Sequence, residues 1–125
     1  MHSLPSVDRA DVRKTDDSSA LILSAGGLHV VMIRVRYDGR WNDVEEVINS
    51  SGDVATGAVN AWTLIGRVLS LELNREAAVK LRFPRDYRVD LALSGDQLNL
   101  VRTSLLEILS TACFVVETPE GRVTS

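Results

Sequence analysis

The sequence predicts an α+β fold in which an antiparallel sheet, a three-stranded meander plus at least one further strand, packs against two long helices. Three observations favour this class. Apolar runs on either side of Gly26-Gly27 are typical of a hairpin. Residues 54–73 form the longest apolar pattern, with their polar residues on one narrow helical stripe. Residues 98–112 repeat apolar residues at steps of three or four, which indicates a second long helix.

The N-terminal segment differs in composition from the rest of the chain. Residues 1–18 mix acidic, basic and polar residues with Pro5 and show neither a helical nor a strand period. Such a segment cannot bury much apolar surface, so we expect a flexible or partner-ordered arm. Residues 19–125 are then predicted to form a single α+β domain, since a chain of this length can bury one core.

The meander is expected to occupy three consecutive segments. Ser19–Ser24 and Leu28–Tyr37 form the first two strands, and Asp38-Gly39 provides a tight turn because both residue types tolerate positive φ angles. The third strand covers Trp41–Asn49, and its change of phase at Glu45-Glu46 is compatible with a β-bulge.

The central helix is predicted to begin after Asp53, whose carboxylate can accept hydrogen bonds from the first helical turn. Gly57 and Gly66 each cost a helix about 1 kcal/mol relative to alanine. Their presence in the apolar stretch 54–73 therefore predicts the close approach of a neighbouring backbone.

The second half of the chain is expected to contain two more helices and a strand. Asn74 can cap a short helix over residues 75–82, which Pro84 prevents from continuing. Residues 87–93 alternate apolar and polar side chains like a half-buried strand. Ser94 and Gln97 have the spacing of a capping box at the start of the second long helix. Residues 114–117 and 122–124 flank a turn and predict a weak hairpin or an exposed tail.

Composition limits the cellular setting and the chemistry. The net charge of −3 and pI near 5.3 argue against a generally basic protein that coats nucleic acid. Cys113 is the one cysteine, which excludes an internal disulfide and favours a reducing, cytoplasmic location. No apolar run of signal-peptide length precedes the domain, and Arg67 and Glu72 interrupt the longest apolar segment, so we expect no membrane insertion.

No metal, cofactor or catalytic residue is predicted. Asp43, Glu45 and Glu46 lack the spacing of a calcium loop and fit the solvated face of a strand. His29 has no neighbouring nucleophile motif, and we expect a structural role in preference to a general base. Cys113 is likewise expected to be a structural cysteine.

Two groups of arginines are the candidate ligand-binding residues, as phosphate contacts in a nucleotide or nucleic-acid patch. The first lies around the predicted hairpin and the second around Pro84, and the fold has to bring them together for one patch to form. They are Arg34, Arg36 and Arg40, and Arg82, Arg85 and Arg88. The simpler interpretation is a solubilising surface in which these arginines pair with the abundant carboxylates.

Residues 28–112 resemble a known family. The segment IRVRYDGRWNDVEEVINSSGD, followed by LIGRVLSLELN, is similar to the TSCPD domain found at the carboxyl end of some ribonucleoside reductases. The family's naming motif corresponds to residues 92–96, where Asp96 is kept and Ser94 replaces the cysteine. The resemblance implies a shared fold, and without the cysteines it implies no metal or redox chemistry.

The function expected from these observations is that of a non-catalytic accessory or protein-interaction module. The resemblance implies a link to ribonucleotide reduction, and a protein partner or self-association is expected because a short meander leaves exposed edges. One alternative is nucleotide or nucleic-acid binding through the arginine groups. The other is a small enzyme whose site forms across a homodimer.

Overall fold

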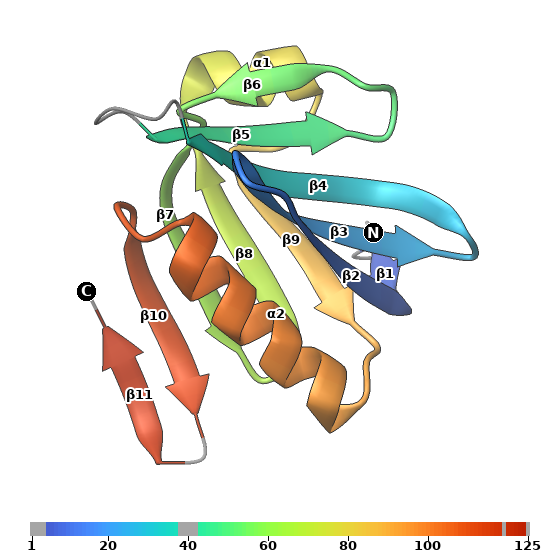
Figure 1. Ribbon diagram of the computed structural model, residues 1–125, viewed down its shortest axis with the longest axis vertical. Helices are drawn as coiled ribbons and strands as arrows, with labels where there is room; N and C mark the ends of the chain where they lie inside the picture. The colour runs from blue at the N-terminus through green and yellow to red at the C-terminus, as the bar shows by residue number, and fades with distance from the viewer. Residues whose placement is uncertain (1–4, 38–42, 119, 125) are drawn as a thin grey trace.

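The computed structural model describes residues 5–37, 43–118 and 120–124 and contains two sheets and two helices (Figure 1). Sheet A has six strands in the order β1-β9-β8-β7-β10-β11, and sheet B has five in the order β2-β3-β4-β5-β6. The strands of sheet A are β1 Ser6–Val7, β7 Val59–Ile65, β8 Val68–Leu73, β9 Asp86–Leu91, β10 Cys113–Thr118 and β11 Gly121–Thr124. Those of sheet B are β2 Arg9–Lys14, β3 Ser18–Ala25, β4 Leu28–Tyr37, β5 Asp43–Asn49 and β6 Val54–Thr56, and the helices are α1 Arg75–Leu81 and α2 Gly95–Ile108.

The predicted fold class is wrong, because residues 54–73 form β6, β7 and β8 and no helix. The two glycines that would be costly in a helix are turn residues, with φ of 60° at both Gly57 and Gly66. Gly66-Arg67 joins β7 to β8 as a two-residue hairpin loop in which Ile65 pairs with Val68. Glycine with positive φ at the first position of such a loop matches the twist of the flanking strands. The protein is therefore a mostly β structure with one long helix and one short one.

The other predicted elements are largely confirmed. β3, β4 and β5 form the antiparallel meander, and the turn Gly26-Gly27 has positive φ at both glycines, as a primed turn requires. Asn74 caps α1, Ser94 caps α2, and β9, β10 and β11 lie close to the predicted ranges. The predicted bulge at residues 45–46 is wrong, since β4 and β5 pair without a register shift, and the irregularity lies at Leu23/Ser24. The predicted turn Asp38-Gly39 lies outside the described residues.

The N-terminal segment contributes a strand to each sheet. β1 pairs in parallel with β9 of sheet A, and β2 pairs antiparallel with β3 of sheet B. Val7 and Ala10 are buried in the core, although the sequence pattern suggested a flexible arm over residues 1–18. Charged residues interrupt the apolar positions of this segment, so the alternation of apolar and polar residues is too short to predict a strand.

The core lies between the two sheets. Alternate residues of each strand face it, and the largest buried side chain is that of Trp62 on β7, which stacks on Phe114 of β10 at a centroid distance of 5.4 Å. α2 places Val101, Leu105 and Ile108 in the same core, and it contacts β2, β3 and β4 while crossing in front of β8 in Figure 1. One face of each sheet is thereby covered, and we call the opposite faces the outer faces. Neither described helix is long and apolar enough to cross a bilayer.

Candidate functional site

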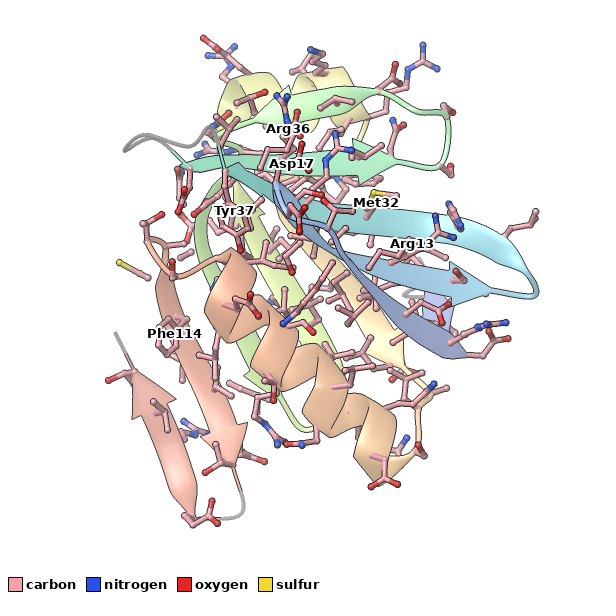
Figure 2. All side chains as sticks on the ribbon, in the orientation of Figure 1. Arg13, Asp17, Met32, Arg36, Tyr37 and Phe114 are labelled. Atoms are coloured by element: carbon pink, nitrogen blue, oxygen red, sulfur yellow. The ribbon has the colours of Figure 1, made fainter. Side chains whose placement is uncertain are left out.

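The outer face of sheet B carries a row of apolar side chains across four neighbouring strands. Cross-strand pairing places Ile22 beside Met32, Met32 beside Ile48, and Ile48 beside Val54. Ile22 is only 2% exposed, yet it does not belong to the core cluster between the sheets. The other three side chains are half-buried (Figure 2, where Met32 is labelled). We call Ile22, Met32, Ile48 and Val54 the apolar row. None of its four side chains belongs to the core cluster between the sheets or packs against that cluster.

A cluster of charged side chains borders the apolar row. Glu46 is only 5% exposed and accepts hydrogen bonds from two guanidinium groups, those of Arg34 and Arg36. The Nε and Nη2 atoms of Arg34 lie 2.9 and 2.8 Å from Oε1 of Glu46. The Nε atom of Arg36 lies 2.8 Å from the same oxygen, and its Nη2 atom lies 3.4 Å from Oε2. Two of the predicted ligand-binding arginines thus converge, on a carboxylate of their own sheet.

A shallow pocket of about 340 Å³ adjoins this cluster. Its lining comes from the ends of β3, β4 and β5 and the turn before β3, as Asp17, Ser18, Arg34, Arg36, Tyr37 and Val44. Thr15 donates a hydrogen bond of 2.7 Å to the Asp17 carboxylate, and the hydroxyls of Thr15 and Ser18 lie 2.8 Å apart. The lining of the pocket therefore includes two guanidinium groups and one carboxylate, that of Asp17, which accepts a hydrogen bond from Thr15.

The second arginine group lies apart from the first. Arg82 adopts a left-handed conformation, with φ of 58°, at the end of α1. Arg85 donates to the backbone oxygen of Leu73 at 3.3 Å. Arg88 lies on the outer face of sheet A and pairs with Asp86 at 2.8 Å. The pocket that Arg34 and Arg36 line contains no arginine of the second group, and the depressions that Arg85 and Arg88 line contain none of the first. Arg40 lies outside the described residues.

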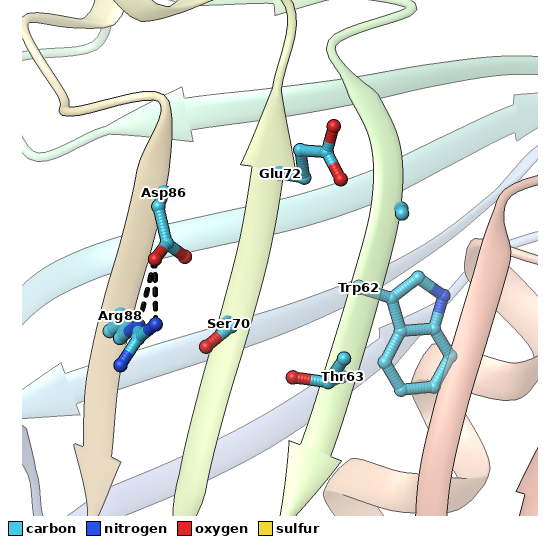
Figure 3. Close-up of a pocket in the computed structure, with 7 residues that line it drawn as sticks. Trp62, Thr63, Ser70, Glu72, Asp86 and Arg88 are labelled. Atoms are coloured by element: carbon cyan, nitrogen blue, oxygen red, sulfur yellow. Dashed lines mark hydrogen bonds and ion pairs between the residues drawn. The ribbon is translucent and has the colours of Figure 1, made fainter.

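The outer face of sheet A is also open and forms a shallow depression of about 190 Å³. Figure 3 shows Thr63 and Ser70 on its floor and the Asp86–Arg88 ion pair at one side. Glu72 and Asp86 are cross-strand neighbours in β8 and β9. Like charges at such positions repel, and Arg88 offsets the repulsion by binding one of the two carboxylates. The Asp86–Arg88 ion pair is thus explained by the structure of the sheet, and no bound ligand is needed to account for it.

A third depression, of about 220 Å³, lies where the end of α2 meets sheet B. Lys14 of β2 binds Glu107 of α2 at 3.0 Å, and Thr111 donates a hydrogen bond of 2.6 Å to Glu45. Desolvation, followed by the nearby negative charge of Glu107, raises the pKa of Tyr37 above its usual value. These contacts attach α2 to β2 and the residues after α2 to β5, so the depression is accounted for structurally.

The remaining predicted chemistry residues are dispersed. His29 is exposed on β4, and its side chain makes no hydrogen bond with another described residue. Cys113 is exposed at the start of β10 in spite of its expected structural role. Among the described residues no three His, Cys, Asp or Glu side chains lie close enough together to hold a metal ion. Asp43 and Glu45 lie on the strand face toward α2, whereas Glu46 points to the outer face and is buried.

Comparisons with known proteins give no family assignment. No family model, no curated protein and no solved structure matches the chain. The residues that carry the resemblance to the TSCPD domain at its helical part, 65–71, lie in the β7–β8 hairpin. The site has to be interpreted from its own geometry.

The apolar row was not predicted from the sequence. A signal is present, because Ile22, Met32, Ile48 and Val54 lie out of phase with the core-facing residues of their strands. That phase becomes informative only when the cross-strand register is known, since a shift of one residue exchanges the two faces of a strand.

Proposed function

We propose that this protein is a non-catalytic protein-interaction module that binds a partner protein through the outer face of sheet B. The observation that carries the proposal is the apolar row, whose half-buried members Met32, Ile48 and Val54 lie on the sheet face opposite the core between the sheets. The link to ribonucleotide reduction stays a prediction from the resemblance alone.

The composition of this face supports protein binding. Methionine and arginine are enriched in protein interfaces, and the centre of an interface is depleted of charged residues. The Arg34–Glu46–Arg36 cluster lies immediately beside Met32 and Ile48, so apolar and charged contacts are available to the same partner. Methionine adapts to different partner shapes because its side chain is unbranched and flexible.

The two alternatives have less support. A nucleotide or nucleic-acid patch would need the arginine groups to act together, but Arg34 and Arg36 lie on sheet B and Arg88 lies on sheet A. Both arginines of the first group already bind Glu46, which reduces the positive charge available to a phosphate. An enzyme formed across a homodimer would need a catalytic group at the interface, and the one histidine that the structure describes, His29, has no bonded partner among the described residues.

A variant in the centre of the row tests the proposal. Met32→Asp places a charge among the apolar side chains and should prevent docking, whereas Val79→Asp changes a side chain that is 74% exposed on α1. Each variant and the wild type would be used as bait in extracts of cells that naturally express the protein, with bound proteins quantified by mass spectrometry. Equal melting temperatures would show that both variants are folded.

The expected result is a bound protein that is recovered with the wild type and Val79→Asp but lost with Met32→Asp. Recovery of every bound protein to the same extent with all three baits would contradict the proposal. Binding of purified nucleotides or single-stranded oligonucleotides that weakens as salt rises would favour the nucleic-acid alternative instead.

A further inference from the structure

We infer that the Arg34–Arg36 pair binds a carboxylate of the partner, from an Asp or Glu side chain that lies next to an aliphatic side chain docked on the apolar row. This inference rests on the proposed function and specifies the class of partner segment. The partner is an acidic and aliphatic segment of a protein.

The first argument is that Glu46 holds both guanidinium groups in position. Each arginine uses Nε and Nη2 on the buried carboxylate, and neither Nη1 group has an acceptor among the described residues. The side-chain torsions of Arg34 and Arg36 are therefore already restricted before a ligand arrives. A ligand that binds preorganised donors loses less conformational entropy than one that has to order them.

The second argument concerns charge. Arg13 lies in the same cross-strand row as Arg34, separated from it by Ala20 of β3. Three arginine charges on this face oppose the two carboxylates of Glu46 and Asp17, and 3 − 2 leaves an excess of one positive charge. The charges of the Arg9–Asp11 ion pair cancel, so this pair does not change the excess. One carboxylate neutralises this excess on the face, whereas a phosphate dianion would give the same set of groups a net negative charge.

The third argument is the spacing of the two features. Arg34 and Met32 are two residues apart on the same face of β4, which separates them by about 7 Å. Neighbouring side chains on one face of an extended segment have the same spacing, and residues three or four apart on a helix are only slightly closer. A partner segment of either kind can thus place its carboxylate on the arginines and its aliphatic side chain on Met32.

The test uses short peptides and the whole 125-residue chain. The ¹⁵N-labelled protein would be titrated with acetyl-Glu-Leu-Glu-amide, with the matched acetyl-Gln-Leu-Gln-amide, and with inorganic phosphate at equal ionic strength. The signals to follow are the arginine Nε–Hε groups and the amide of Ser18, which lines the pocket. We expect the glutamate peptide to shift these signals and the glutamine peptide to leave them unchanged.

Variants make the test specific. Arg36→Gln should weaken the binding of the glutamate peptide about tenfold, because one charge-assisted hydrogen bond contributes about this much to affinity. Arg88→Gln removes an exposed arginine on sheet A and should change nothing. The inference is overturned if the glutamate peptide shifts no arginine signal, if Arg36→Gln binds it as well as the wild type, or if only phosphate produces the shifts. The proposed function has its own test: it is contradicted if the Met32→Asp bait recovers every protein that the wild type recovers.

Discussion

Asn49 at the end of β5 offers a sharp test of the fold, because its side chain joins three parts of the chain. Its Nδ2 atom donates to the backbone oxygen of Leu81 at the end of α1 and to the carboxylate of Asp53, both at 3.0 Å. Its Oδ1 atom accepts from the backbone amides of Ser51 at 3.0 Å and Asp53 at 2.9 Å. The side chain is only 9% exposed. Asn49→Ala removes all four bonds.

The size of the effect follows from where the lost partners lie. A hydrogen bond within a protein contributes about 1 kcal/mol, so four bonds set an upper limit of about 4 kcal/mol. Ser51 and Asp53 are exposed, and water can replace their bonds, whereas the Leu81 oxygen is left buried without a donor. We therefore expect Asn49→Ala to lower the free energy of unfolding by about 3 kcal/mol, and the melting temperature by roughly 10 °C.

Urea unfolding followed by circular dichroism measures this loss. Asn60→Ala is the matched control, since Asn60 is exposed on β7 and its substitution should change the free energy of unfolding by less than about 0.5 kcal/mol. A loss below about 1 kcal/mol for Asn49→Ala, or an equal loss for both variants, would refute the reasoning.

Three further predictions concern charge, pH and thiol reactivity. Glu46→Gln should lower the free energy of unfolding by about 2 kcal/mol, because a buried acceptor for two guanidiniums loses its charge, and the exposed Glu72→Gln should have almost no effect in the same urea experiment. Burial raises the pKa of Tyr87 from 10.0 to about 12. The neutral phenol thus stabilises the fold fully below pH 10, and the free energy of unfolding should fall by about 3 kcal/mol as pH rises toward 12. If the free energy of unfolding of a Tyr87→Phe variant fell by the same amount over this pH range, Tyr87 would not be the cause. Cys113 is exposed, so the native protein should react with a thiol reagent within minutes and Cys113→Ser should not; reaction only after denaturation would contradict the described position of β10.

Turn chemistry explains both the success and the failure of the fold prediction. Gly26-Gly27 is predictable as a turn because short strand-like runs flank it. Gly66-Arg67 has the same character, but the apolar residues around it also fit a helical period, so the sequence pattern predicts one long helix there. Where two apolar strands are joined by only two residues, period alone cannot separate a hairpin from a buried helix. The positive φ of Gly66 decides between them.

The arginine cluster shows a similar limit. That Arg34 and Arg36 share one strand face follows from the sequence, since side chains alternate. That Glu46 binds them depends on the connection between β4 and β5. A two-residue turn at Asp38-Gly39 would pair Arg34 with Asp43, whereas the observed register pairs it with Glu46. The site therefore depends on a loop length that residue patterns do not determine.

The topology of the two sheets has a consequence for how the chain is made. Residues 9–56 contain all of sheet B as neighbouring segments, so its pairing can be completed while later residues are still being synthesised. Sheet A is completed later. β7 can pair with β8 as soon as both are synthesised, but its pairing with β10, for example of Ala61 with Cys113, requires a segment about 50 residues further along the chain. Non-local pairing of this kind is slow. During that interval the free edge of β7 and the unstacked Trp62 are open to other nascent chains, which makes β7 the segment where a chaperone would be most useful.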